Sequence, residues 1–207
     1  MNDAGVRPFS IRALLEDRAR YLVPMYQRNY AWGEGEITQL LQDVLDYQQK
    51  LVSGKGPQTY YIGTLVVFAR DDGSFEVIDG QQRFTTLSLL ANWLKHHAID
   101  SVDMSWYQTI NLAFESRPIS SHTFERLWQG VAPYDLRGST FNEGLVNGFE
   151  LIDKAMADLG LVGAKLTAFC DYLFKHVQIS RIELPKDTDL NHFFEAKIGR
   201  AHVCTPV

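Results

Sequence analysis

The sequence predicts an α+β fold: a small mixed sheet with flanking helices and a helical C-terminal half. Residues 59–69 and 75–80 are short runs of β-branched and aromatic residues joined by the turn sequence RDDGS, which predicts a hairpin. Apolar residues recur at helical spacing on both sides of this hairpin, over residues 34–51 and 81–99. Strands and helices are therefore expected to be interspersed along the chain.

The N-terminal segments predict a helix followed by extended structure. Residues 11–20 have helical periodicity, and Ser10 before them is a suitable N-cap. The next stretch, YLVPMYQRNYAW, is aromatic and favours a strand, with Pro24 near its start, where a strand edge tolerates proline.

The C-terminal half has weaker signals. Residues 105–132 and 141–177 predict mostly helical structure, broken at RPISS and at APYDLRGST. Residues 176–185 return to strand character, and TDLNHFFEA predicts the beginning of another helix. We predict one domain over residues 9–196. Its parts are an α/β core over about 9–100, a helical insertion over about 101–176, and a return strand with a truncated helix over about 177–196.

The composition is that of an ordinary globular protein. Of the 207 residues 45% are hydrophobic, and the formal net charge of -5 argues against broad electrostatic wrapping of DNA, although it allows a local basic patch. No apolar run approaches the roughly 18 residues of a membrane span, and residues 1–8 do not resemble a secretory signal. Cys170 and Cys204 lack the spacing of metal ligands or of a disulfide framework. We therefore expect a reducing, cytoplasmic location.

The pentapeptide DGQQR, Asp79 to Arg83, stands where the second hairpin strand is expected to meet a helix. One interpretation is purely structural: Asp79 is the N-cap of the helix, Gln82 completes a capping box, and Gly80 eases the turn. That interpretation leaves Gln81 and Arg83 without a role.

The other interpretation of this corner is a phosphate site. A helix N-terminus presents unpaired backbone N–H groups and the positive end of the helix dipole. Gly80 permits close backbone approach, and the Arg83 guanidinium can bond two phosphate oxygens at once. Two carboxamides can orient water without adding charge, and Asp79 can hold magnesium or a water molecule. The pattern therefore suits the phosphates of a nucleotide.

The stretch VPMYQRNYAW is a second candidate site. If extended, it places Tyr26, Arg28, Tyr30 and Trp32 on one face, and an arginine among aromatic rings can stack on a base or bind a phosphate. The alternative is an aromatic strand in the core, with only the Arg28 head group at the surface. Two such motifs on neighbouring strands favour a shared pocket.

Three motifs, VPMYQRNYAW, YYIGTLVV and FEVIDGQQRFTTLSLL, resemble in order and spacing the N-terminal domain of the GmrSD-type restriction enzymes, a family marked by DGQQR. The resemblance runs from about residue 9 to residue 196. It implies a ParB/sulfiredoxin-like fold and a domain that binds and hydrolyses a nucleoside triphosphate to regulate a phage-defence restriction protein. The alternative is a ParB-like nucleotide switch, or a DNA-binding module, without turnover.

The resemblance also implies roles for single residues. Those implied to be catalytic are Asp79, Gln81, Gln82 and Arg83. Those implied to bind the nucleotide are Tyr26, Gln27, Arg28, Gly63, Thr64 and Gly80. The cofactor expected from the family is Mg²⁺, with Asp79 as its protein ligand. The expected partners are modified DNA and, in the complete protein, a C-terminal HNH-type nuclease domain; assembly into a homo-oligomer is left open.

The chain departs from the family's pattern in three respects. Gln81 stands where sulfiredoxins have a catalytic cysteine, which excludes thiol chemistry at this corner. An Asn-x-Arg-Gly segment is expected after HFFEA, but the chain instead reads KIGRAHVCTPV over residues 197–207, which resembles a translated sequencing adapter and is interpreted as a non-native tail. The nuclease domain is also missing. We therefore expect an incomplete pocket that binds nucleotide weakly and hydrolyses it slowly if at all, and exposed Phe193 and Phe194 side chains.

Overall fold

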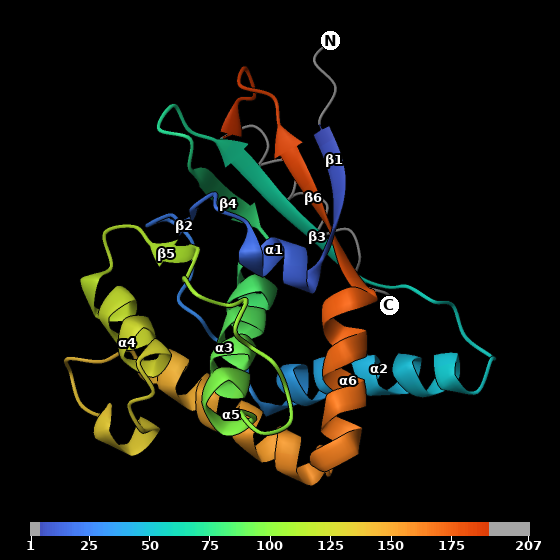
Figure 1. Ribbon diagram of the computed structural model, residues 1–207. Helices are drawn as coiled ribbons and strands as arrows, with labels where there is room; N and C mark the ends of the chain where they lie inside the picture. Colours follow the sequence, from blue (N-terminus) through green and yellow to red (C-terminus); the bar gives the residue numbers. More distant parts are fainter. Residues whose placement is uncertain (1–4, 191–207) are drawn as a thin grey trace, which may run out of the picture.

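One mixed sheet of six strands organises the computed structural model of the chain, which describes residues 5–190 (Figure 1). The strands are β1 (Gly5–Ser10), β2 (Tyr21–Val23), β3 (Tyr60–Ala69), β4 (Phe75–Asp79), β5 (Leu112–Phe114) and β6 (Val177–Leu184). Their order in the sheet is β1-β6-β3-β4-β2-β5. The pairs β1–β6 and β3–β4 are antiparallel, whereas β3–β6, β2–β4 and β2–β5 are parallel.

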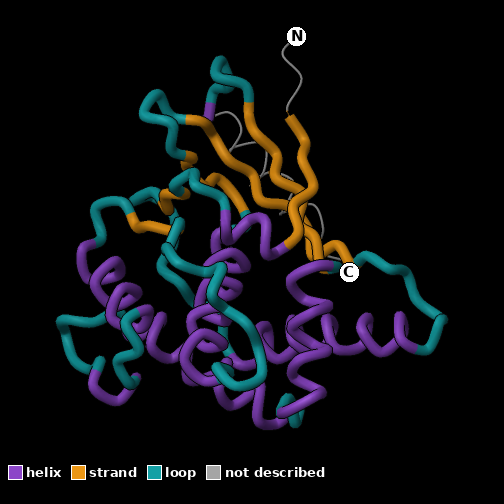
Figure 2. The backbone as a smooth tube through the Cα atoms, viewed as in Figure 1, coloured by secondary structure: helices purple, strands orange, loops and turns teal. Residues whose placement is uncertain are grey.

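The helices gather on one side of this sheet, as the backbone in Figure 2 shows. They are α1 (Ile11–Glu16), α2 (Glu34–Val52), α3 (Gln81–His97), α4 (Pro118–Trp128), α5 (Glu143–Asp158) and α6 (Gly163–Lys175), with a 3₁₀ turn at Pro133–Asp135. Helix α3 descends from the sheet into the middle of the helical layer (Figure 1). It is buried on nearly every side: among residues 81–94, Arg83 alone is not buried.

The main hydrophobic core joins the helices to one face of the sheet. Its largest fully buried side chains include Tyr21, Phe84, Tyr107, Phe124 and Phe169, which come from both halves of the chain. A smaller apolar cluster of Val66, Ile78 and Leu184 is separate from it. Among the described residues, no helix is long and apolar enough to cross a membrane.

The predicted α+β class is confirmed, with helices and strands interspersed as expected. The hairpin is formed by β3 and β4, and the helices predicted over 34–51 and 81–99 correspond to α2 and α3. The strand predicted over 176–185 corresponds to β6. The likeness to the ParB/sulfiredoxin fold and the proposed division of the domain stay predictions.

Two expectations were wrong, and one strand was missed. The aromatic stretch is a strand only over Tyr21–Val23, and the chain from Pro24 to Gly33 is a loop, which we call the 24–33 loop. The segment 105–132 was expected to be mostly helical with a break at RPISS, but the helix there, α4, begins within that sequence at Pro118. Before it, Leu112–Phe114 form β5 beside β2. Strand β1 was not predicted. Most of the helix expected at 188–196, with Phe193 and Phe194, and the tail at 197–207 lie outside the described residues, which end at position 190.

A buried arginine ties five segments of the fold together. Arg181 of β6 donates hydrogen bonds to Tyr21 Oη at 2.7 Å and to Asp17 Oδ2 at 3.1 Å. Tyr21 Oη in turn donates to Asp17 Oδ2 at 2.6 Å. The guanidinium lies 4.7 Å from the ring centre of Phe9 and 4.5 Å from that of Phe75. Because Arg181 is only 6% exposed, its charge depends on these neighbours.

We predict that Asp17→Asn lowers the free energy of unfolding by about 2 kcal/mol. Removing one partner of a fully buried ion pair costs about 3–5 kcal/mol, and the effect is smaller here because the Asp17 side chain is 23% exposed. The matched control is Glu16→Gln, since Glu16 pairs with Arg12 at the surface and such pairs contribute about 0.5 kcal/mol or less. Urea unfolding followed by circular dichroism measures both; equal losses would contradict the proposed dependence of Arg181 on Asp17.

Candidate functional site

Strand β4 meets helix α3 at a glycine corner. The strand ends at Asp79, Gly80 is the N-cap with a left-handed φ of 88°, and the helix begins at Gln81. A Cβ atom on residue 80 would lie 2.6 Å from the carbonyl oxygen of Thr64 on β3. Only glycine therefore allows β4 and α3 to turn this close to β3.

Within residues 5–190, no side-chain hydrogen bond caps this helix N-terminus, where Gly80 is the N-cap residue. The interpretation of Asp79 as the N-cap is therefore wrong, because the left-handed turn places Gly80 at the cap and Asp79 one residue before it. The backbone N–H of Phe84 forms the first helical hydrogen bond, with the Gly80 carbonyl at 3.0 Å. The N–H groups of Gln81, Gln82 and Arg83 precede that bond, so the corner presents the positive end of the helix dipole.

Arg83 lies against an irregular part of β3. The pairing of β3 with β6 shifts register between Tyr61 and Thr64, and Gly63 within this shift has a φ of 113°. A Cβ atom on residue 63 would lie 3.1–3.4 Å from atoms of the Arg83 guanidinium. Bulges of this kind often occur beside functional sites, where they redirect the strand. Here the bulge leaves room for a cationic head group beside the backbone.

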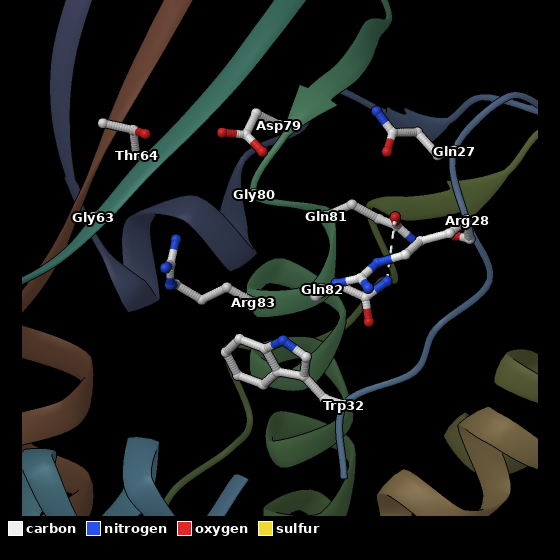
Figure 3. Close-up of a pocket in the computed structure, with 10 residues that line it drawn as sticks. All are labelled: Gln27, Arg28, Trp32, Gly63, Thr64, Asp79, Gly80, Gln81, Gln82 and Arg83. Carbon is white, nitrogen blue, oxygen red and sulfur yellow. Dashed lines mark hydrogen bonds between the residues drawn. The ribbon is translucent and has the colours of Figure 1, made fainter. Parts of the chain in front are cut away.

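The two glutamines of the corner hold the backbone of the 24–33 loop, and Figure 3 draws their side chains beside Arg28. Gln81 Nε2 donates to the Arg28 carbonyl at 3.0 Å, and Gln82 Nε2 donates to the Asn29 carbonyl at 3.0 Å. The Ala31 N–H donates to Gln82 Oε1 at 2.8 Å. Both ends of the Gln82 carboxamide are thus used by the loop. Gln81 Oε1 has a weaker contact, at 3.4 Å from Gln82 Nε2.

The loop is fixed at two further points. Gln27 Nε2 donates to the Ile78 carbonyl of β4 at 2.8 Å. Tyr30 is 4% exposed, and its hydroxyl lies 2.9 Å from Thr86 Oγ1 of α3. Burial raises the pKa of Tyr30 to about 12, so this hydroxyl stays protonated at neutral pH. The Arg28 side chain between these two points is exposed.

These segments enclose a cavity of about 420 Å³ at the corner (Figure 3). Its lining residues are Gln27, Arg28, Trp32, Gly63, Thr64, Asp79, Gly80, Gln81, Gln82 and Arg83. Every residue given a role from the sequence lies here except Tyr26. Trp32 was given no role, although its place on the same motif as Arg28 was a usable signal.

Tyr26 lies apart from this cavity. Its side chain is 55% exposed, and its hydroxyl donates to Glu76 Oε1 at 2.5 Å. Partial burial and the Glu76 carboxylate both raise the pKa of Tyr26. The expected common face of Tyr26, Arg28 and Tyr30 does not form, because the loop turns after Pro24 instead of continuing the strand.

The electrostatic character of the cavity is set by two arginines, Arg28 and Arg83, the helix N-terminus, and one carboxylate, Asp79. Residues 5–190 contain no group of three or more histidine, cysteine, aspartate or glutamate side chains that could hold a metal ion. A single carboxylate fits a magnesium ion that takes most of its ligands from phosphate and water. It does not fit a metal ion held by protein ligands alone.

The residues that line this cavity also lie within the part of the chain that matches a known protein family. The family described as GmrSD restriction endonuclease, N-terminal domain, matches residues 11–196. The chain belongs to this family. The family membership expected from the motifs is confirmed, and the GmrSD N-terminal domain has its DGQQR motif on the wall of the cavity. Among curated proteins, none matches the chain.

For this GmrSD N-terminal domain we predict that Gly80→Ala is far more destabilising than Gly73→Ala. Both glycines have a left-handed φ, 88° and 82°, but a Cβ atom on residue 73 would meet nothing within 4 Å. The backbone conformation alone costs about 1 kcal/mol in each variant. The collision with the Thr64 carbonyl should cost Gly80→Ala about 2 kcal/mol more. Thermal unfolding of both variants measures this difference, and equal losses would show that the corner can relax away from β3.

Proposed function

We propose that this domain binds a nucleoside triphosphate at the glycine corner and hydrolyses it, as the regulatory part of a phage-defence restriction protein. The observation that carries the proposal is the convergence of an uncapped helix N-terminus with Arg28 and Arg83 on one cavity of about 420 Å³. Backbone N–H groups and guanidinium groups are the donors that proteins use for phosphate. A cavity of this size is in the range of small-molecule sites.

Each lining residue receives a role in this proposal. The α3 N-terminus and Arg83 bind the terminal phosphate and stabilise the charge that develops during its transfer. Gly80 lets a phosphate approach the backbone of the corner, and Gly63 lets the Arg83 guanidinium approach the backbone of β3. Thr64 forms the part of the cavity wall beside Gly63. Arg28 binds the remaining phosphates together with Gln27, while the Trp32 ring is available to stack on the base.

We assign to Asp79 and Gln81 the role of positioning the attacking water. Gln82 uses both ends of its carboxamide on the 24–33 loop, so we propose that it supports catalysis by holding that loop. Gln81 Oε1 is less committed and can accept a hydrogen bond from water. A magnesium ion bound with the nucleotide would supply charge neutralisation of the phosphates, with Asp79 as its protein ligand or the ligand of its water.

One observation favours the alternative of binding without turnover. Gln82 Oε1 already accepts a hydrogen bond from the Ala31 N–H, and Gln81 Oε1 lies 3.4 Å from Gln82 Nε2, so neither glutamine oxygen is wholly available to orient water. A ParB-like switch, in which nucleotide binding reorganises the domain, needs only the phosphate-binding groups. Modified DNA and an HNH-type nuclease domain are proposed as partners of the complete protein in either case.

We predict that the chain releases phosphate from at least one of the four ribonucleoside triphosphates in the presence of Mg²⁺, and that Arg83→Ala lowers this rate about 100-fold or more, because a donor aimed at developing charge is removed. The matched control is Arg126→Ala on α4, whose guanidinium contacts only Gln129 among the hydrogen-bond partners found in residues 5–190.

The same experiment separates the two functions. Isothermal titration of each nucleotide shows binding independently of turnover. Binding that is lost in Arg83→Ala, with no phosphate release by the unaltered chain, would support the switch. Unchanged turnover in Arg83→Ala would reject the catalytic assignment.

A further inference from the structure

The turn between β5 and α4 reaches across to the loop that lines the cavity. Arg117, the residue before α4, donates from Nη2 to the Met25 carbonyl at 2.9 Å and to the Gln27 carbonyl, and from Nη1 to the Arg28 carbonyl at 3.5 Å. These three carbonyls belong to the segment that carries the Gln27 and Arg28 side chains. A residue about 90 positions away thus holds one wall of the cavity from its outer side.

Arginine suits this contact for a geometric reason. Its planar guanidinium presents several N–H donors in a fixed fork, whereas a lysine ammonium is a single point that cannot reach three separated carbonyls at once. The approach of Arg117 is set by Ser116, the one non-glycine residue with a positive φ in residues 5–190, at 55°. A non-glycine residue in this conformation is strained, and the surrounding contacts must hold it there.

A second connection from the same turn reaches Tyr26. Glu115 accepts hydrogen bonds from Arg70 Nη1 at 2.7 Å and Nη2 at 3.0 Å. Arg70 also donates from Nε and Nη2 to Glu76 Oε2, at 2.9 and 2.6 Å. Glu76 Oε1 then accepts from the Tyr26 hydroxyl at 2.5 Å. Two connections therefore join the loop to this turn. Arg117 holds the loop backbone directly, and the Tyr26 side chain is linked to Glu115 through Glu76 and Arg70.

We propose that Arg117 is a positioning residue for the nucleotide cavity. It fixes the backbone of residues 25–28 so that Gln27 and Arg28 face the ligand, and it couples the cavity to the helical half of the domain. Tyr26, which has no place in the cavity, assists from outside through Glu76. The effect of Arg117 on nucleotide binding rests on the proposed function. Its hold on the backbone of residues 25–28, which we call the clamp, does not.

The coupling has a measurable consequence. If the loop is released, only a fraction of molecules holds Arg28 in the binding position, and the apparent dissociation constant rises by the inverse of that fraction. Loss of one hydrogen bond to a charged donor changes such an equilibrium about tenfold or more. Saturating nucleotide should restore the ordered loop, because it selects the binding-competent molecules.

The test measures amide hydrogen exchange by mass spectrometry on the 207-residue chain and on Arg117→Ala, Arg117→Lys and Arg126→Ala. The Gln27 and Ala31 N–H groups report on the loop, since they donate to the Pro24 carbonyl and to Gln82 Oε1. We expect exchange in residues 24–32 to rise at least about tenfold in Arg117→Ala, less in Arg117→Lys, and not at all in Arg126→Ala. Exchange in the core of α3 should stay the same.

The second measurement titrates the same proteins with each of the four ribonucleoside triphosphates and Mg²⁺. We expect Arg117→Ala to weaken binding about tenfold or more, with protection of the loop restored at saturation. If Arg117→Ala does not fold, Arg117→Lys serves in its place, with a smaller expected loss of nucleotide affinity and a smaller rise in loop exchange.

The outcomes separate this inference from the proposed function. Unchanged loop exchange in Arg117→Ala, or faster exchange throughout the molecule, overturns the clamp. A looser loop with unchanged nucleotide affinity overturns the positioning role. A looser loop in a protein whose unaltered form binds none of the four nucleotides supports the clamp and rejects the proposed function.

Discussion

The contact between Gly80 and the Thr64 carbonyl determines where helix α3 begins relative to the sheet. Strand β3 pairs with both β4 and β6, so its backbone is fixed from both sides, and the left-handed turn must pass it without a Cβ atom. From that corner α3 runs through the middle of the helical layer (Figure 1) and is buried along most of its length. The burial of α3 in the core thus holds its N-terminus, with three backbone N–H groups, at the surface of the cavity. A helix with less burial could not keep these donors in place.

The corner also organises the loop opposite. Gln81 and Gln82 are 4% and 9% exposed and use their carboxamides on loop backbone. Buried amides that lose such partners are costly, so the loop and the corner stabilise each other. This gives the two glutamines of the DGQQR motif a structural reason to be amides, since a carboxylate could not donate to a carbonyl. Arg83 is then the charged side chain that the first turn contributes to the cavity, beside the two glutamines.

The sequence was informative where the signal is local. The β3–β4 hairpin follows from two apolar runs and the turn RDDGS, and α2 and α3 follow from helical spacing. The elements it missed depend on distant partners: β1 pairs with β6, about 170 residues away, and the three-residue β5 exists only beside β2. The 24–33 loop resembles a strand in composition, but Gln81, Gln82 and the burial of Tyr30 impose another path. The corner residues were identified as one site because they are contiguous, and Trp32 shares a motif with Arg28, whereas Arg117 contacts the loop only through the tertiary fold.

The proposed function depends on a phosphate site at the α3 N-terminus. The most direct measurement is a two-dimensional ¹H–¹⁵N NMR titration of the chain with a nucleoside triphosphate and Mg²⁺. If nucleotide binds there, the backbone amides of Gln81, Gln82 and Arg83 shift most, together with the Arg83 Nε–H, while the amides at the start of α6 (Gly163–Lys175), such as Lys165 and Leu166, do not move. Shifts centred on another part of the molecule, or no shift at the corner with any of the four nucleotides, would contradict it.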